Sequence, residues 1–291
     1  MKPVRIGIIG GRGNMGRWFE DFFIQAGHSV QICDLDTDQT PEMLARSCDV
    51  IVLSLPIQTA ITMCKKIGPL LSPDQLLMDV CSLKTPILEA MLHDSPAQVM
   101  GVHPLFGPFT ETIRGQNIIV CSGRGGSLVQ RMIALLRNYG AAVTFMEPQK
   151  HDRYMAIVQG LTHMITVSFA RTLEMLAVDP EESLLVATPV FRANMDLTAR
   201  LFAQDLELYR TLMASNPYVE PVLEAYSAAL NESRTKLLSG CNHSGLGYLE
   251  SIRDFLGPFC QQGLDESNRM LRAIYQDETQ ESRKNDYQPC L

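Results

Sequence analysis

The stretch that decides the fold is Val-Arg-Ile-Gly-Ile-Ile-Gly-Gly-Arg-Gly-Asn-Met-Gly, at residues 4–16. Its apolar first half predicts a buried strand, and glycines 11, 13 and 16 predict a tight turn that opens a helix. A second apolar run leads to Asp34, which follows Gly16 by 18 residues. This order of strand, glycine turn, helix, strand and acidic residue is typical of a unit that binds a nicotinamide dinucleotide.

The residues of this turn have separate predicted tasks. Gly11 lets the chain turn, Gly13 lets the backbone approach a pyrophosphate, and Gly16 lets the helix pack on the sheet. Asp34 would accept hydrogen bonds from the ribose and repel a 2′-phosphate, which favours NAD over NADP. Two alternatives stay open, since Arg12 could reach such a phosphate and Asp34 could merely open a turn. We predict cofactor binding by Gly11, Gly13, Asn14, Met15, Gly16, Asp34 and, at the end of the third strand, Ser54 and Pro56.

Strands and helices continue to alternate up to about residue 148. The helical stretches between the apolar runs supply the crossovers that parallel strands need. We therefore predict an α/β class with a Rossmann-type, doubly wound parallel sheet at residues 1–148. The predicted strands, of the kind buried on both faces, lie at 4–9, 30–33, 50–53, 76–78, 99–102, 117–121 and 142–145.

The pattern changes after residue 148, where strand-like runs give way to long stretches with helical spacing of apolar residues. We predict an all-helical C-terminal domain at 149–291, whose last residues, 277–291, form a flexible polar tail. A helical domain this apolar is expected to bury surface against a second copy of itself.

Composition excludes several classes of protein. The chain has 291 residues, 46% of them hydrophobic and 20% charged, as expected of a globular enzyme. Its net charge of −7 argues against a nucleic-acid partner. It has no apolar run of the ~20 residues that a membrane span needs, and Arg5 interrupts the N-terminal run, so we expect a cytoplasmic protein. The eight cysteines are scattered, which predicts buried, reduced thiols and no metal site.

A histidine follows the predicted strand at 99–102. His103 begins His-Pro-Leu-Phe-Gly-Pro, and it would lie at the same carboxyl edge of the sheet as the cofactor. An imidazole suits hydride transfer from a carbinol carbon, because a base with a pKa near neutrality can remove the hydroxyl proton. From position alone, a structural loop histidine is an equally good interpretation.

Four segments carry a more specific resemblance. In chain order they are Asp-Val-Cys-Ser-Leu-Lys (79–84), Gly-Val-His-Pro-Leu-Phe-Gly-Pro (101–108), Gln-Gly-Leu-Thr-His (159–163) and Arg-Ala-Asn-Met-Asp-Leu-Thr-Ala-Arg-Leu-Phe-Ala-Gln-Asp (192–205). On these segments the chain closely resembles the prephenate dehydrogenase family over about residues 4–275. Coincidence is a poor explanation, because separate segments agree in order through both predicted domains.

The resemblance implies an oxidative decarboxylation in tyrosine biosynthesis. NAD would take hydride from the ring carbon that bears the 4-hydroxyl, the ring carboxylate would leave as CO2, and 4-hydroxyphenylpyruvate would form. His103 matches the family's catalytic histidine, which hydrogen-bonds the hydroxyl and removes its proton. Ser82 matches a serine near that hydroxyl and the nicotinamide, so we predict it as the second catalytic residue.

The resemblance also implies four substrate-binding residues. Arg200 matches an arginine that holds a substrate carboxylate, which suits a planar guanidinium. Tyr209 matches a position near the substrate's side chain, and His163 matches a binding histidine. Lys84 could steer the dianionic substrate or could be a solvated lysine at a helix start.

Two further residues are interpreted as structural. Arg192 has Asp196 four residues further along the predicted helix, which favours an ion pair over substrate binding. His151 is expected at a helix start, where it would position the domain junction.

Some features depart from the family pattern. Cys81 replaces a smaller residue before the serine, and residues 109–112 could alter the substrate loop. Because the chain starts directly at the first strand, we expect a monofunctional form without a fused chorismate mutase. The resemblance also implies a homodimer that pairs through the helical domains. Arogenate and 4-amino-4-deoxyprephenate stay open as substrates, and a non-catalytic NAD-binding regulator is the alternative of another class.

Overall fold

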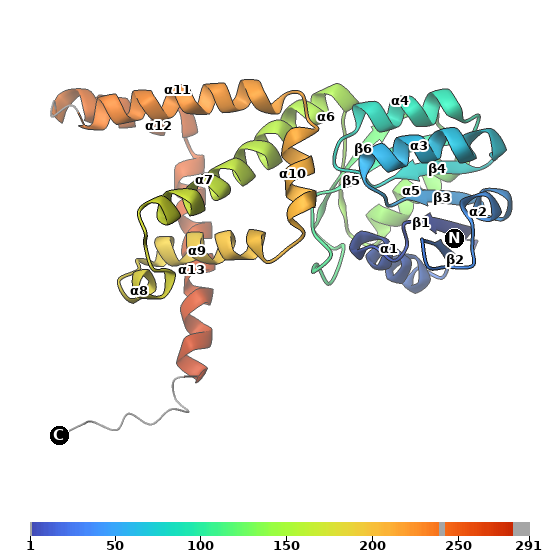
Figure 1. The fold of residues 1–291 in the computed structure, drawn as a ribbon, viewed down its shortest axis with the longest axis horizontal. Helices are drawn as coiled ribbons and strands as arrows, with labels where there is room; N and C mark the ends of the chain where they lie inside the picture. The colour runs from blue at the N-terminus through green and yellow to red at the C-terminus, as the bar shows by residue number, and fades with distance from the viewer. Residues whose placement is uncertain (1, 239–241, 282–291) are drawn as a thin grey trace. The chain divides into compact units, whose positions relative to one another are not determined.

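The computed structural model describes residues 2–238 and 242–281 and divides the chain into two compact units (Figure 1). The first unit runs to Val158 and also includes Ala214–Tyr218, and the second comprises Gln159–Met213 and the chain from Val219 onward. The predicted boundary at residue 148 falls at the start of helix α6 (Pro148–Met155), which belongs to the first unit. This helix carries two residues that prove important for the site.

A seven-stranded sheet in the order β2-β1-β3-β4-β5-β6-β7 forms the centre of the first unit. β1 pairs in parallel with both β2 and β3, and the parallel pairing continues through β4 to β5. The predicted Rossmann-type fold is confirmed. The strands are β1 (Arg5–Ile9), β2 (Ser29–Cys33), β3 (Val50–Leu53), β4 (Leu76–Asp79), β5 (Gln98–Pro104), β6 (Asn117–Ser122) and β7 (Ala142–Phe145).

β6 departs from the prediction of an all-parallel sheet. It pairs antiparallel with β5, and His103 lies opposite Ile119. The reason is the connection at residues 105–116, which contains no helix, because a parallel partner would need a crossover. β7 then runs parallel to β6 after the crossover helix α5 (Ser127–Asn138).

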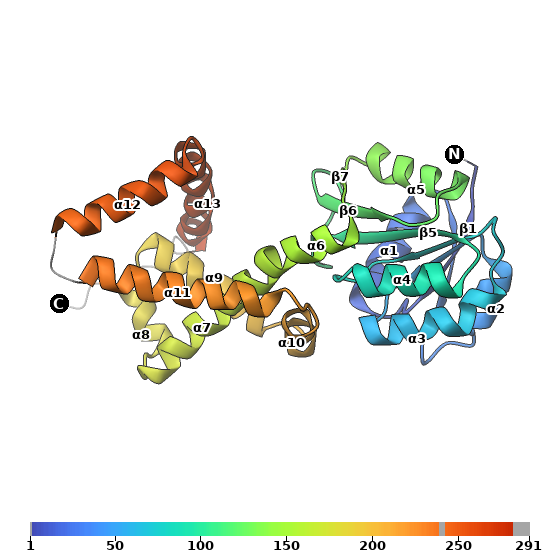
Figure 2. The same cartoon turned by 90° about the horizontal axis from the view of Figure 1, so that it is seen from above.

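Helices cover both faces of the sheet, as Figure 2 shows. Strand residues alternate between the faces, so that Val50 and Val52 join one hydrophobic cluster while Ile51 and Leu53 join the other. The first cluster contains α1 (Asn14–Gln25) and α5. The second contains α2 (Pro41–Ser47), α3 (Ile57–Ile67) and α4 (Thr85–Asp94). Five of the cysteines are buried in the first unit as predicted, whereas Cys260 of the second unit is exposed.

The glycine turn is packed tightly against its own backbone. Gly10, which the sequence reasoning missed, is the residue with a left-handed backbone (φ 85°), and a Cβ there would lie 2.1 Å from the Ser54 carbonyl oxygen. A Cβ on Gly16 would lie 2.2 Å from the Gly10 carbonyl oxygen, so the start of α1 can approach the turn only without a side chain. Gly13 differs, because its Cβ would meet only that carbonyl oxygen, at 3.4 Å.

The second unit is helical, as predicted. A π-helical stretch at Ala156–Leu161 precedes α7. At the other end, α13 continues through Glu281, past residue 277, where the tail was predicted to start. The rest of the predicted tail, residues 282–291, lies outside the described residues. Among the described residues, no helix has both the length and the hydropathy that a membrane span needs. The helices after the π-helix are α7 (Thr162–Met175), α8 (Pro180–Leu185), α9 (Pro189–Phe202), α10 (Leu206–Ala214), α11 (Val219–Leu238), α12 (Asn242–Leu256) and α13 (Phe259–Glu281).

The two glycines of the turn are expected to respond differently to an added methyl group. Gly16→Ala should lower the free energy of unfolding by about 1–3 kcal/mol, because its Cβ overlaps backbone. Gly13→Ala should change it by less than about 0.5 kcal/mol and weaken dinucleotide binding instead. Urea denaturation and a binding titration of both variants check this; equal losses of stability would contradict the packing argument.

Candidate active site

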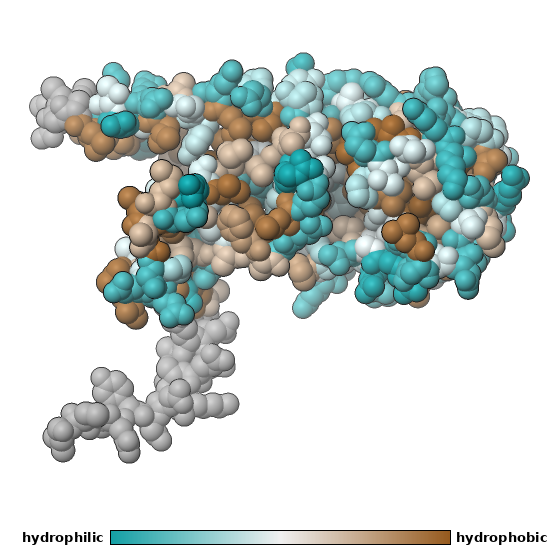
Figure 3. Space-filling model, viewed as in Figure 1, coloured by the Kyte–Doolittle hydropathy of each residue, from teal (hydrophilic) through white to brown (hydrophobic). Residues whose placement is uncertain are grey.

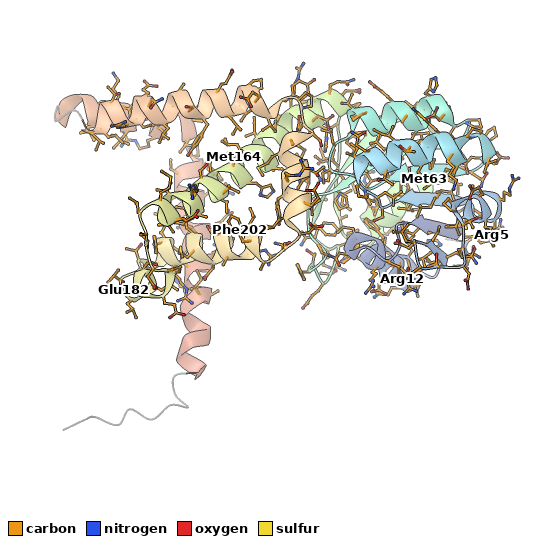
Figure 4. The ribbon with its side chains drawn as sticks, in the orientation of Figure 1. Arg5, Arg12, Met63, Met164, Glu182 and Phe202 are labelled. Atoms are coloured by element: carbon orange, nitrogen blue, oxygen red, sulfur yellow. The ribbon has the colours of Figure 1, made fainter. Side chains whose placement is uncertain are left out.

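Asp34 holds the glycine turn in place. Its Oδ2 accepts a hydrogen bond from the backbone N–H of Arg12 at 2.8 Å, and its Oδ1 accepts one from the N–H of Leu35 at 2.8 Å. The turn suggested by the alternative interpretation is also present, since Thr37 hydrogen-bonds the backbone of Asp34. The Arg12 guanidinium lies 3.7 Å from Asp36, beside α1 in Figure 4. Asp34 thus lies at the strand end where a ribose would be bound.

The other predicted cofactor residues gather at the same edge. Asn14 and Met15 are the first two residues of α1, and Gly13 is its N-cap. The Ser54 N–H donates to the Ile9 carbonyl at 2.9 Å, and Pro56 precedes the first residue of α3. The structure therefore brings the carboxyl ends of three adjacent strands and one helix N-terminus together. Direct contact of these residues with a cofactor stays a prediction.

His103 lies near the end of β5 and is 2% exposed. The loop after it is anchored to α1, because the Trp18 indole N–H donates to the Thr110 carbonyl at 2.6 Å. The Trp18 ring also lies 4.8 Å from the ring of Phe106, centroid to centroid. The segment His-Pro-Leu-Phe-Gly-Pro is therefore fixed at both its strand and its loop end.

A second histidine lies against the first. The distance between Nδ1 of His103 and Nε2 of His151 is 2.8 Å, and Nδ1 of His151 lies 2.8 Å from Oδ1 of Asp152. Both rings are buried, and so is the carboxylate. The sequence interpretation of His151 as a residue that only positions the domain junction is therefore incomplete. His151 lies 48 residues after His103, and no local pattern signals their contact.

Asp152 joins three elements of the first unit. Its Oδ1 accepts the N–H of Lys84 at 2.8 Å and its Oδ2 accepts the N–H of Thr85 at 2.9 Å, so the carboxylate caps α4. The amide of Asn216 donates to its backbone carbonyl at 2.7 Å. Burial opposes ionisation of this carboxyl, but the hydrogen bonds from His151, Thr85 and Lys84 outweigh it, and the pKa of Asp152 is lowered. Asp152 is therefore a carboxylate at neutral pH.

Lys84 corrects the sequence expectation. Its side chain is fully buried, where it pairs with Asp79 and donates to the carbonyl of Val102, the residue before His103, at 2.9 Å. The interpretation of Lys84 as a solvated lysine is therefore wrong. Its burial also gives no support to direct contact with the substrate. Burial, His151 and the positive charge of Lys84 together hold the pKa of His103 well below the ordinary histidine value of 6.5. The His103 imidazole is therefore neutral at physiological pH.

Ser82 lies between β4 and α4, two residues before Lys84, and is half-buried. β4 is the direct neighbour of β5 in the sheet, with Asp79 opposite Gly101. Ser82 thus follows β4, and His103 lies near the end of its parallel neighbour β5. A hydroxyl role in catalysis stays a prediction.

In the second unit the structure brings together two of the predicted substrate residues. The rings of His163 on α7 and Tyr209 on α10 lie 4.9 Å apart in an edge-to-face arrangement. Burial lowers the pKa of His163, so this ring is neutral at pH 7. His163 follows the π-helical stretch by two residues, and such stretches are frequent at functional sites.

The arginines of α9 differ in their surroundings. Arg192 lies 3.3 Å from Asp196, four residues further on, which confirms the predicted ion pair. Arg200 is exposed near the C-terminal end of the helix, where its carbonyl accepts a hydrogen bond from the Gln204 amide at 2.8 Å. Phe202, labelled in Figure 4, ends the same helix. The role of Arg200 toward a carboxylate stays a prediction.

The fold and the site together define a dinucleotide-dependent dehydrogenase with a buried histidine at the carboxyl edge of its sheet. Family models agree, since the nucleotide-binding domain of prephenate dehydrogenase matches residues 15–145 and its dimerization domain matches residues 147–246. The chain belongs to the prephenate dehydrogenase family. This membership confirms the predicted family, the dehydrogenase class and the nucleotide cofactor.

Individual relatives extend over most of the chain. The T-protein of Enterobacter agglomerans is 28% identical over 91% of this chain and 71% of its own length. The 4-amino-4-deoxyprephenate dehydrogenase of Streptomyces pristinaespiralis is 25% identical over 92% of this chain and 96% of its own length. Among solved structures, prephenate dehydrogenase from A. aeolicus, in complex with hydroxyphenyl propionate and NAD+, has a TM-score of 0.71 at 19% identity. It covers 87% of this chain and 97% of its own, and this likeness shows the fold.

The buried pair of Lys84 and Asp79 predicts a double-mutant result. Lys84→Met should lower the free energy of unfolding by about 3–5 kcal/mol, because it leaves the buried Asp79 carboxylate without its cation. The double variant Asp79→Asn/Lys84→Met should recover most of that loss. Guanidinium denaturation of the wild type, the two single variants Lys84→Met and Asp79→Asn, and the double variant measures the effect. Additive losses in the double variant would show that the two charges are not coupled.

Proposed function

We propose that this chain oxidises and decarboxylates prephenate to 4-hydroxyphenylpyruvate, with NAD as hydride acceptor, in tyrosine biosynthesis. Family membership supports the class of reaction. The observation that carries the proposal is the buried, neutral His103 at the end of β5, next to the strand that leads to Ser82. A neutral imidazole can take up a hydroxyl proton, whereas an imidazolium cannot.

The residues of the turn fit a dinucleotide. A Cβ at Gly13 would meet only one protein atom within 4 Å, so backbone and ligand can approach there, and the α1 N-terminus favours a pyrophosphate. The cofactor, when bound, supplies a nicotinamide ring that accepts hydride. His103 removes the proton of the 4-hydroxyl, and Ser82 orients that hydroxyl. Arg200 binds a substrate carboxylate, and His163 and Tyr209 contact the rest of the substrate.

Asp34 supports NAD as the cofactor. Its carboxylate, fixed by the N–H groups of Arg12 and Leu35, would hydrogen-bond a ribose and repel a 2′-phosphate. The Arg12 guanidinium, which could otherwise serve NADP, lies beside Asp36, although that pair is long and exposed.

A second candidate substrate is 4-amino-4-deoxyprephenate. The observation that favours it is the match to the Streptomyces pristinaespiralis enzyme, which covers 96% of that relative. Arogenate, with an amine in the side chain, is the third. A non-catalytic regulator is the least favoured alternative, because the base and its supporting carboxylate are both present.

Substrate choice is tested with the purified chain and each of the three compounds, with NAD or NADP. We expect prephenate and NAD to give one NADH and one CO2 per turnover. His103→Asn should keep substrate and NAD binding and lower kcat by about 10²–10⁴, the usual contribution of a general base. Rapid oxidation of the amino analogue with negligible turnover of prephenate would overturn the assignment.

The pKa of His103 predicts how kcat/KM depends on pH. Because its pKa lies well below 6.5, the base is unprotonated at neutral pH and kcat/KM should stay level as pH falls to 6.5. Activity should decline only at lower pH, as His103 takes up a proton. A kcat/KM profile from about pH 5 to 9 measures this. An acid limb centred at or above 6.5 would show that burial does not lower the pKa as the structure indicates.

We also propose a homodimer formed through the helical unit. The matching C-terminal model is described as a dimerization domain. Figure 3 shows hydrophobic side chains at the surface of α11 and α12, and several are largely exposed. A soluble monomer rarely exposes so much contiguous apolar surface. The most exposed apolar residues of these two helices are Leu230, Leu238, Leu246 and Phe255.

Charged substitutions on this surface should dissociate the dimer. We expect Leu246→Lys/Phe255→Lys to shift the mass found by light scattering from about twice 32.4 kDa to 32.4 kDa. Met43→Lys, at a similarly exposed apolar residue of α2, is the matched control and should remain dimeric. A dimer that survives the double substitution would place the interface elsewhere.

A further inference from the structure

We propose that His151 and Asp152 are positioning residues that set the tautomer of His103 and share its charge during proton transfer. The basis is the hydrogen-bonded chain His103–His151–Asp152, in which both nitrogen-to-partner distances are 2.8 Å. All three side chains are buried within the first unit. The inference deepens the proposed function, since it assumes that His103 acts as the base.

Which atoms donate in these hydrogen bonds can be worked out by starting from the carboxylate of Asp152. Asp152 already accepts backbone N–H groups on both oxygens, so it is an acceptor. A ring nitrogen 2.8 Å from its Oδ1 must then carry the hydrogen, which places the proton of His151 on Nδ1. In a neutral imidazole the other nitrogen has no hydrogen, so Nε2 of His151 is an acceptor.

The position of the hydrogen on His103 follows in the same way. Because Nε2 of His151 accepts, Nδ1 of His103 must donate, and its single hydrogen in the neutral ring lies there. Nε2 of His103 therefore carries the lone pair, as a general base requires. The opposite tautomer would place two lone pairs, or two hydrogens, face to face across 2.8 Å.

The chain also provides a place for the proton. When the substrate O–H bond breaks, an N–H bond forms on Nε2 of His103, and the oxygen electron pair becomes a carbonyl as hydride leaves to the dinucleotide. The Nδ1 hydrogen of His103 can then shift to Nε2 of His151. The resulting imidazolium is His151, with its Nδ1–H on the Asp152 carboxylate. The proton returns through His103 to solvent after the product leaves.

The surrounding charges favour this transfer. Lys84, which pairs with Asp79, disfavours a positive charge on His103, and so does burial. His151 is closer to the counter-charge, because it contacts Asp152 directly. These are the charged and titratable groups of the first unit that the described contacts bring to the two rings. The extra proton is therefore favoured on His151, next to the Asp152 carboxylate, over His103.

Substitutions of His151 separate positioning from packing. Gln can offer an amide oxygen near the position of Nε2 and keep the tautomer of His103, whereas Leu cannot. We expect His151→Leu to lower kcat by about 10²–10³ and His151→Gln to be at least about tenfold faster than Leu, with KM changed less than about threefold. Lys150→Gln, on the exposed side of α6, is the control and should match the wild type.

Asp152→Asn tests the counter-charge. The amide oxygen can keep the place of Oδ1, which accepts from Lys84 and His151, so the change removes the negative charge and the hydrogen bond from Thr85. The same carboxylate-to-amide change in the serine protease triad costs about 10⁴ in kcat. We expect a loss of about 10²–10⁴, and the residual activity should have its acid limb at lower pH, because the protonated pair has lost its carboxylate.

The inference fails if His151→Gln and His151→Leu lose activity equally, or if Asp152→Asn moves only KM or the unfolding midpoint. A readout without substrate is the ¹⁵N spectrum of histidine-labelled enzyme at pH 8, assigned among the six histidines with the variants. Hydrogen on Nδ1 of both His103 and His151 supports the proposed hydrogen bonds, and hydrogen on Nε2 of His103 overturns them. If the spectrum supports these hydrogen positions but no cyclohexadienyl compound is oxidised, the proposed function fails and the inference about the tautomers stands.

Discussion

The carboxylate of Asp152 is the group on which the rest of the candidate site depends. It is buried, it caps α4 through the N–H groups of Lys84 and Thr85, and it holds the ring of His151. A buried carboxylate is costly unless its oxygens are hydrogen-bonded, and here the backbone and one imidazole satisfy them. One negative charge thereby fixes the start of a helix and the orientation of the histidine that contacts His103.

The sheet places the remaining groups of the first unit at one edge. Parallel strands end at one edge, so the glycine turn after β1, Asp34 after β2, Ser82 after β4 and His103 on β5 share that edge. Lys84 adds a positive charge within the fold and binds the carbonyl beside His103. Lys84 pairs with Asp79 at the end of β4, and its positive charge contributes to the lowered pKa of His103.

Much of this could be predicted from the sequence, because the deciding signals are local. Apolar runs, the glycine turn and the spacing to Asp34 predict the sheet and its cofactor edge, and the place of His103 after an apolar run, together with the family resemblance, predicts the base. What could not be predicted depends on contacts between distant segments. The His103–His151 contact and the burial of Lys84 leave no periodic signal, whereas the antiparallel β6 follows from the connection at 105–116, which contains no helix. Gly10 was missed because the space for its Cβ is taken by the Ser54 carbonyl, which follows a different strand, β3.

The central claim is that Asp152, through His151, presents His103 as a base with its lone pair on Nε2. Neutron diffraction from crystals of the deuterated wild-type protein at neutral pH tests it most directly, because it locates hydrogen positions on the rings. The account predicts deuterium on Nδ1 of His151 and of His103, and none on Asp152 or on Nε2 of His103. Deuterium on Nε2 of His103, or on the Asp152 carboxyl, would contradict it.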